Sequence, residues 1–238
     1  MSVMEKATEA VMRLRYGLPR TPRELEATLL LLATLRSEGW QASVQRGSSS
    51  GLGRRPIPWW TYSASHWLDL ALTRDHRVLE FGSGGSTAWL AERTAQVHSI
   101  EHDAKWDEIV RRTLPANASL ILVESRGDFS WAPTGDPYPA VIDEISGQFD
   151  VVVIDGMSRN TCAERACERI TESGLIVFDD ADRPEYAPSH RLLSELGFGR
   201  IDFFGPKPAV GHLSMTCIFS RDFNSWTRNL ELPLPSGY

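Results

Sequence analysis

The sequence predicts an α/β fold: a seven-stranded, mainly parallel sheet with an antiparallel last strand, preceded by an N-terminal helical extension. Three observations lead to this prediction. The chain has 238 residues, enough for one α/β domain of roughly 200 residues with a short addition. From residue 77 onward, short apolar runs alternate with amphipathic segments, as in βαβ units. The part before residue 60 shows only helical spacing, so we divide the chain into an extension (1–58) and a domain (59–238).

Composition argues against several classes of protein. The 25 basic and 31 acidic residues give a net charge of −6, so no general attraction for nucleic acid or an anionic membrane is expected. No apolar run approaches the ~20 residues of a membrane-spanning helix, and the three cysteines lack metal-binding spacing. We expect a soluble, cytoplasmic protein whose cysteines are buried thiols.

The extension is expected to contain one long helix. Thr21, Pro22 and Glu24 form a capping-box pattern with proline at the first helical position, and leucines then recur at helical spacing until Gly39. This predicts a helix over residues 22–38. Its leucine stripe could pair with a second copy of the chain, which would make the protein a homodimer.

The next segment, residues 41–58, is rich in Gly, Ser and Arg and predicts a mobile loop. Trp59, Trp60 and Tyr62 follow it and lead into a helix through Leu72. These aromatic side chains could line a substrate pocket over which the loop closes. Alternatively, they dock their helix on the core.

The domain is predicted to contain seven strands separated mostly by helices. The strands are expected at Arg77–Phe81, Val97–Glu101, Leu120–Val123, Asp150–Ile154, Leu175–Asp179, Ile201–Phe204 and Met215–Phe219. The helices are expected near residues 86–94, 104–113, 161–172 and 188–196. The connection between the last two strands is too short for a helical crossover, which predicts an antiparallel pair there.

A glycine-rich turn, EFGSGGST at residues 80–87, follows the first predicted strand. Its glycines let the backbone approach a ligand, and the next helix offers free N–H groups to an anion. The following strand ends in Glu101, 19 residues after Gly82, where a carboxylate can accept hydrogen bonds from both hydroxyls of a ribose. This pattern predicts a nucleoside-binding half. A nicotinamide-binding protein would share it, but Thr87 stands where its third small residue is expected.

Residues 77–220 resemble the class I S-adenosylmethionine-dependent methyltransferases. Their first motif, an acid followed by G-x-G-x-G, corresponds to Glu80, Gly82, Gly84 and Ser86, with serine in place of the last glycine. FDVVVIDG at 149–156 and GLIVFDD at 174–180 are similar to the family's fourth motif and fifth strand. The resemblance implies a Rossmann-like sheet, S-adenosylmethionine as cofactor and methyl transfer. It also implies cofactor contacts from Glu80, Gly82, Ser83, Gly84, Ser86, Thr87, Glu101, Asp128 and Asp155, with Asp128 near the adenine.

Carboxylates gather at the predicted carboxyl ends of the strands, where open α/β sheets bind ligands. Asp155, Asp179 and Asp180 follow neighbouring strands, and such crowding calls for a shared cation. Their hard oxygens suit Mg²⁺, and the trio is similar to the metal sites of catechol-type and sugar O-methyltransferases. Ser158 stands where catechol-type enzymes carry a lysine base. The alternative is that Asp155 contacts the methionine end of the cofactor while the aspartate pair caps backbone N–H groups.

The candidate catalytic residues are Asp155 and His212. His212 lies in the loop before the last strand and can overhang the crevice, and histidine accepts protons near neutral pH. Arg159 and Arg183 could hold an anionic part of the substrate, or pair with a nearby carboxylate.

We therefore predict an S-adenosylmethionine-dependent methyltransferase that acts on a hydroxyl of a small molecule, with or without Mg²⁺. Trp59, Trp60, Tyr62 and Arg159 are expected near the substrate. Two alternatives stay open: a nicotinamide-dependent oxidoreductase, and a non-catalytic binding protein with the same fold.

Overall fold

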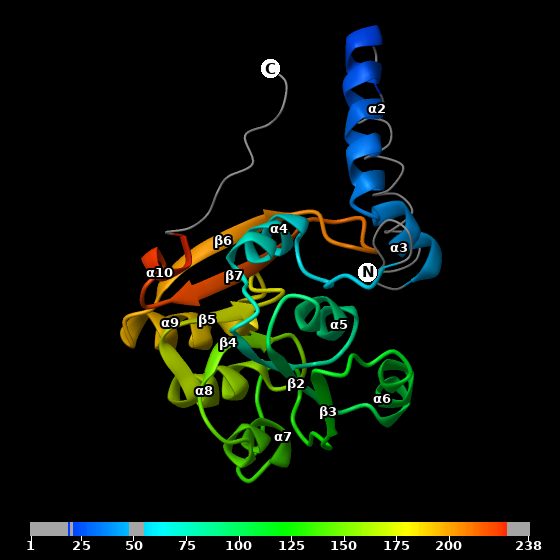
Figure 1. The fold of residues 1–238 in the computed structure, drawn as a ribbon. Helices are drawn as coiled ribbons and strands as arrows, with labels where there is room; N and C mark the ends of the chain where they lie inside the picture. The colour runs from blue at the N-terminus through cyan, green and yellow to red at the C-terminus, as the bar shows by residue number, and fades with distance from the viewer. Residues whose placement is uncertain (1–18, 20, 48–54, 228–238) are drawn as a thin grey trace.

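A seven-stranded sheet forms the centre of the computed structural model, which describes residues 19, 21–47 and 55–227 (Figure 1). The strands are β1 (Arg77–Phe81), β2 (Gln96–Glu101), β3 (Ala118–Leu122), β4 (Phe149–Ile154), β5 (Ile170–Phe178), β6 (Gly199–Gly205) and β7 (Ser214–Ser220). They lie in the order β3-β2-β1-β4-β5-β7-β6. β1 to β5 are parallel, and β7 runs antiparallel to both of its neighbours. The predicted fold class is confirmed.

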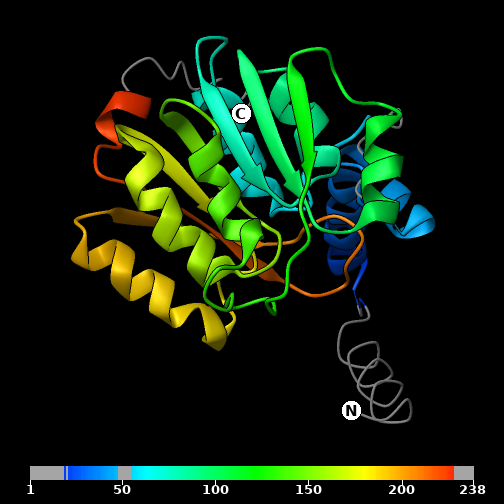
Figure 2. The same cartoon turned by 90° about the horizontal axis from the view of Figure 1, so that it is seen from below.

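Helices cover both faces of this sheet (Figure 2). They are α2 (Pro22–Ser37), α3 (Trp40–Arg46), α4 (Tyr62–Ala71), α5 (Gly85–Ala91), α6 (Ala104–Arg111), α7 (Pro137–Ala140), α8 (Arg159–Arg169), α9 (Ala187–Glu195) and α10 (Asn224–Thr227), with 3-10 turns η2 (Val141–Glu144) and η3 (Pro184–Tyr186). Among the described residues, no helix is both long and apolar enough to cross a membrane.

Alternation along β4 explains the two layers. Val151 and Val153 pack with α4, α5 and Trp226 of α10, whereas Val152 and Ile154 pack with residues of α7, α8 and α9. Side chains of successive strand residues point to opposite faces, so a strand buried on both faces reads as a continuous apolar run. This pattern is why the central strands could be predicted from the sequence.

Several predicted boundaries were wrong, and in two places the structure forms a different kind of element from the one predicted. The helix expected at 161–172 ends at Arg169, because β5 begins at Ile170 and pairs with Phe149 across a register shift. Part of the loop expected at 41–58 is helical: α3 spans Trp40–Arg46 between two glycines, Gly39 and Gly47, in the left-handed region. Residues 48–54 of that predicted loop lie outside the described residues.

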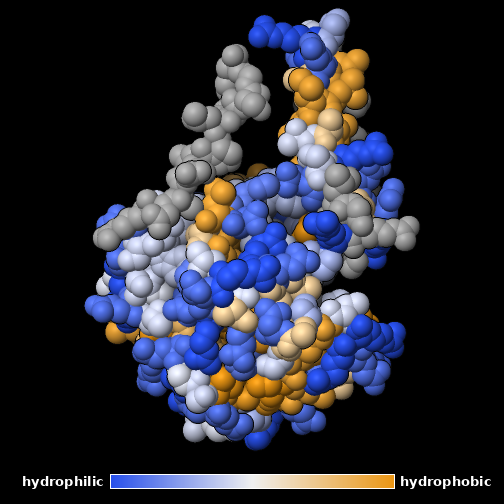
Figure 3. All heavy atoms as spheres, in the orientation of Figure 1, coloured by the Kyte–Doolittle hydropathy of each residue, from blue (hydrophilic) through white to orange (hydrophobic). Residues whose placement is uncertain are grey.

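The predicted N-terminal helix is confirmed as α2. The Thr21 hydroxyl accepts a hydrogen bond from the Glu24 N–H at 3.2 Å, and the Glu24 carboxylate accepts one from the Thr21 N–H at 3.2 Å. No residue of α2 is buried, and the helix projects away from the domain with apolar side chains on its surface (Figure 3). Its leucines therefore contribute nothing to the core of this chain.

The register of the sheet places several predicted site residues at one edge. Phe81 of β1 pairs with Ile154 of β4, and Ile154 pairs with Phe178 of β5. The residues that follow these three, including Gly82 and Asp155, must therefore emerge side by side. β7 is antiparallel and begins where the parallel strands end, so the β6–β7 loop reaches the same edge.

Candidate functional site

A cavity of about 460 Å³ lies at the carboxyl edge of the sheet, within the roughly 300–1,000 Å³ typical of ligand sites. It adjoins the boundary between β1 and β4, where the strand order reverses, which is the usual ligand position in such sheets. The glycine-rich loop forms one side and the aspartate trio another. The lining residues are Trp59, Gly82–Ser86, Trp106, Phe129, Asp155, Arg159, Asp179, Asp180, Arg183, Lys207, Val210 and His212.

The glycine-rich loop needs its glycines for two different reasons. Gly82 has φ of +93°, and a Cβ there would lie 2.8 Å from the Gly156 nitrogen, so only glycine fits between β1 and β4. Gly84 faces more open space, with the Trp106 ring 3.8 Å from where its Cβ would be. The Trp106 indole donates to the Ser83 carbonyl at 2.8 Å. The loop thus presents backbone and an aromatic ring to the cavity.

Glu101 is tied to this loop. One carboxylate oxygen, Oε2, accepts hydrogen bonds from the Ser83 N–H at 3.1 Å and hydroxyl at 2.6 Å. The other accepts the backbone N–H groups of His102 and Asp103 at 2.8 and 2.9 Å. Burial raises the pKa of Glu101, but the bonds from His102, Asp103 and Ser83 outweigh it and lower the pKa to about 2. Glu101 is therefore ionised beside the loop, behind Ser83 rather than in the cavity lining.

Glu80 and Thr87 lie beneath the loop and do not line the cavity. The Thr87 hydroxyl donates to Glu80 at 2.6 Å and accepts the Gly84 N–H at 3.0 Å. The Ser99 hydroxyl donates to the same Glu80 oxygen at 2.5 Å. Glu80 is fully buried, and this burial raises its pKa to about 7 despite the hydroxyl partners. Thr87 thus links the buried Glu80 carboxylate to the Gly84 N–H of the loop.

Asp155 lines the cavity and is held from two sides. The Trp60 indole donates to Oδ2 at 3.2 Å, and the Arg159 guanidinium donates to Oδ1 at 3.1 Å. Trp60 is completely buried and packs edge-on against Trp89, with ring centroids 6.2 Å apart. Burial, with repulsion from Asp179, raises the pKa of Asp155 to about 7. Trp60 therefore orients Asp155 and does not itself line the cavity.

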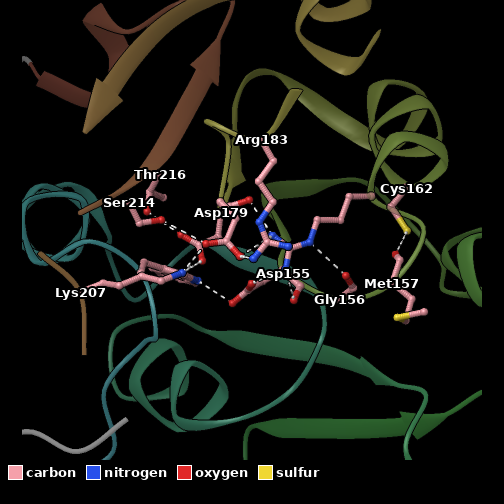
Figure 4. Close-up of polar contacts among 12 residues, drawn as sticks. Asp155, Gly156, Met157, Cys162, Asp179, Arg183, Lys207, Ser214 and Thr216 are labelled. Atoms are coloured by element: carbon pink, nitrogen blue, oxygen red, sulfur yellow. Dashed lines mark hydrogen bonds and ion pairs between the residues drawn. The ribbon is translucent and has the colours of Figure 1, made fainter. Parts of the chain in front are cut away.

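Asp179 and Asp180 share a buried ammonium group, that of Lys207. Figure 4 shows Lys207 and Asp179 beside Ser214 and Thr216. The Nζ atom of Lys207 lies 3.0 Å from Asp179 Oδ2 and also donates to Asp180 Oδ1. Thr216 and Ser214 of β7 donate their hydroxyls to Asp179 Oδ1 at 2.7 Å and Asp180 Oδ1 at 3.1 Å. Burial lowers the pKa of Lys207, but the two carboxylates more than offset this and raise it, so the amine stays charged.

These contacts do not fit the predicted Mg²⁺ site. Arg183 donates a further hydrogen bond to Asp180 Oδ2 at 2.5 Å. With this bond, every carboxylate oxygen of Asp155, Asp179 and Asp180 has a protein partner. Within the described ranges, no three His, Cys, Asp or Glu side chains are arranged to hold a metal ion. Within the described part of the chain, the partners of the Asp179 and Asp180 carboxylates are side chains, so the alternative of backbone capping by this pair is not seen either. The cation that Asp179 and Asp180 share in the structure is the ammonium group of Lys207.

Arg159 is buried and forms an ion pair with Asp155, which is the alternative to the predicted contact with the substrate. Its guanidinium donates to the carbonyls of Gly156 at 3.0 Å and Asp179 at 2.6 Å, besides its bond to the Asp155 carboxylate. Burial lowers its pKa, but the surrounding carboxylates raise it overall. Because these bonds join the ends of β4 and β5, Arg159 fixes the spacing of the aspartates and has few donors left for a substrate. Arg183 pairs with Asp180 in the same way.

The remaining predicted residues divide into two groups. Trp59 and His212 line the cavity as expected. Asp128 does not, because its carboxylate accepts the N–H groups of Ser130 and Trp131, both at 2.7 Å, within its own loop. Tyr62 is also away from the cavity: it is buried at the start of α4, and burial raises the pKa of its hydroxyl.

Sequence reasoning missed Lys207, Trp106 and Phe129. Lys207 is one of only three lysines in the chain and stands in the β6–β7 loop. The argument that singled out His212, a loop overhanging the crevice, applies equally to Lys207. Phe129 follows Asp128 and takes the place in the lining that was expected for it. No spacing pattern marks Trp106, which lies on α6 and reaches the loop through the fold.

Comparisons with known proteins find a matching family model and solved structures that are similar to this chain. Residues 79–181 match a family model described as a methyltransferase domain. Spermidine synthase from Thermotoga maritima has 12% identity and a TM-score of 0.51 over 70% of this chain and 62% of its own, which shows a shared fold. A methyltransferase-like protein from Silicibacter pomeroyi has 25% identity and a TM-score of 0.46 over 69% and 89%. A putative methyltransferase from Streptococcus mutans, solved with SAH, has 11% identity and a TM-score of 0.47 over 69% and 99%.

No curated protein matches the chain. The family match begins within β1 and ends just after β5, so it includes the glycine-rich loop, Glu101 and the aspartate trio. Outside it lie the Trp59 segment and the loop that carries Lys207 and His212. Residues 79–181 therefore carry a methyltransferase domain.

Proposed function

We propose that this methyltransferase transfers a methyl group to a hydroxyl of a small molecule bound in the cavity. One observation carries the proposal: a single cavity is lined both by the glycine-rich loop and by two groups able to accept a proton, Asp155 and His212. The cofactor and the acceptor can therefore meet in one cavity. The chain's net charge of −6 favours an acceptor other than nucleic acid.

The loop side fits the cofactor. S-adenosylmethionine, when bound, supplies the methyl group on a positively charged sulfur. Gly82 and Gly84 would allow it close to the backbone, and the ionised Glu101 would accept its ribose hydroxyls in competition with the Ser83 hydroxyl. Trp106 and Phe129 offer flat apolar surface for a purine ring.

The aspartate side fits an acceptor hydroxyl. A hydroxyl must lose its proton as its oxygen forms the new bond to carbon, and a base is most effective when its pKa is near the working pH. Asp155 meets this condition, because burial raises its pKa to about 7. Trp60 and Arg159 hold the carboxylate in place. Trp59 and Val210 add apolar surface to the cavity lining, which would help exclude water from the acceptor oxygen as it develops negative charge.

The proposal is tested by incubating the full chain with S-adenosylmethionine and a panel of phenols, sugars, amines and thiols, followed by mass spectrometry of the products. We expect a mass gain of one methyl group on a hydroxyl compound. Asp155→Asn should lower turnover by about 10²-fold or more, the scale of one general base. Asp75→Asn, an exposed aspartate before β1, is the matched control. Methylation of amines or thiols alone would contradict the choice of oxygen.

A further inference from the structure

We propose that the Lys207 ammonium is the resident cation of the aspartate trio, in the place a divalent metal would take, and that the enzyme works without metal. Lys207 would also donate a hydrogen bond to the acceptor oxygen. That second role rests on the proposed function; the first depends only on the cation site itself.

The Lys207 ammonium is buried and bonded to two carboxylates, as a bound cation would be. Nζ bonds to one oxygen of each of Asp179 and Asp180, and the lysine side chain is only 8% exposed. Asp180 has φ of +51°, in the left-handed region that non-glycine residues seldom adopt. Ser214 donates to the same Asp180 oxygen as the lysine. Several elements therefore converge on one amine.

The charges of the site balance without a metal. Three carboxylates, those of Asp155, Asp179 and Asp180, face three cations, Lys207, Arg159 and Arg183. A divalent ion would have to displace the ammonium, because the carboxylate oxygens already have partners. The exchange would leave one uncompensated positive charge beside a cofactor that is itself a cation.

The loop that carries Lys207 is anchored so that the amine stays in place. Pro206 and Pro208 flank the lysine, and each proline fixes a backbone angle. The Pro206 carbonyl accepts the Tyr62 N–H at 3.1 Å, and the Val210 carbonyl accepts the Trp40 indole at 2.9 Å. The described residues take up two of the three ammonium donors, and Lys207 lines the cavity. Its remaining donor can therefore serve an acceptor oxygen.

The test is Mn²⁺ binding to the full chain, followed by electron paramagnetic resonance, with Lys207→Met and, as matched control, the exposed Lys105→Met. We expect no submillimolar Mn²⁺ binding by the unmodified protein or by Lys105→Met. Lys207→Met, whose carboxylates lose their cation, should bind Mn²⁺, and adding Asp180→Asn should abolish that binding. Binding by the unmodified protein that Asp180→Asn removes would overturn the proposal. So would an absence of binding in Lys207→Met, since the trio would then not be a cation site.

Folding of Lys207→Met is checked by thermal unfolding with and without Mg²⁺. We expect Mg²⁺ to raise the melting temperature of this variant by several degrees and to leave the unmodified protein unchanged. An unmodified protein stabilised by Mg²⁺ through Asp180 would contradict the proposal even if the variant cannot be purified. Since neither measurement involves methyl transfer, failure to find an acceptor would count against the proposed function and not against the cation assignment.

Discussion

The Ser83 hydroxyl donates a 2.6 Å hydrogen bond to Glu101 Oε2, so the glycine-rich loop is tied to the end of β2 by the carboxylate expected to hold a ribose. The serine hydroxyl stands in chemically for a ribose hydroxyl, because both are donors to a carboxylate. Glu101 is thus held ionised and oriented before any cofactor arrives.

From this relationship we predict effects of different size on cofactor affinity at the two residues. Glu101→Gln should weaken S-adenosylmethionine binding about 10- to 100-fold, because bonds to a charged acceptor are worth about 1.5–3 kcal/mol each. Ser83→Ala removes only the competing donor and should change the affinity by no more than a few-fold. Equilibrium dialysis with labelled cofactor measures both, with the exposed Glu108→Gln as control. Equal losses in Ser83→Ala and Glu101→Gln would show that Glu101 acts only by holding the loop.

The buried Glu80 should make stability depend on pH. Its pKa is about 7 in the fold against an ordinary 4.5, so between these values the unfolded chain ionises while the folded one keeps its proton. Native stability therefore falls as pH rises from 4.5 to 7 and then levels off. The difference of 2.5 units corresponds to about 3 kcal/mol.

Glu80→Gln tests this directly, because glutamine does not ionise. Its carbonyl can accept the Thr87 and Ser99 hydroxyls, but its amide would replace Oε1, which has no partner in the described structure. We expect the variant to be less stable than the unmodified protein at pH 5 and to gain about 3 kcal/mol relative to it at pH 8. Urea unfolding at the two pH values gives the difference. A pH-independent effect would contradict a raised pKa.

Asp155 and Trp60 together should set the pH dependence of the reaction. Because burial raises the pKa of Asp155 to about 7, kcat/KM should rise with pH through that value as the carboxylate loses its proton. Trp60→Phe removes a donor that favours the charged form, which raises the pKa and moves this limb to higher pH. Asp155→Asn should abolish the limb. The measurement is the pH profile of kcat/KM for Trp60→Phe, taken with an acceptor identified in the mass-spectrometry screen. A shift of the limb to lower pH would be incompatible with Asp155 as the base.

The sequence prediction of a homodimer concerns α2. Leu29, Leu30, Leu31 and Leu32 are 50–63% exposed, and a contiguous apolar surface of this kind favours association. If α2 pairs with a second copy, the double variant Leu29→Glu and Leu32→Glu should be monomeric while the unmodified chain is dimeric. Light scattering coupled to gel filtration measures both masses. A monomeric unmodified protein at the concentrations used would refute the dimer.

Most of the sheet could be predicted because its strands are apolar runs buried on both faces, and the turn at Gly82 because its chemistry is local. His212 was found from topology alone. The site chemistry was harder: the cation of the trio is a lysine 27 residues beyond Asp180 in sequence, and only tertiary packing of the β6–β7 loop brings them together. The prediction that Asp128 lines the cofactor site was wrong for a local reason: its carboxylate accepts the N–H groups of Ser130 and Trp131 within its own turn.

The most direct test of the central claim, that the loop at Gly82–Ser86 beside Glu101 binds the adenosyl cofactor of a methyltransferase, is calorimetric titration of the full chain. S-adenosylhomocysteine and reduced nicotinamide dinucleotide are titrated in parallel. We predict saturable binding of S-adenosylhomocysteine at micromolar concentration and no heat of binding with the nicotinamide. Binding of the nicotinamide without binding of S-adenosylhomocysteine would contradict the account.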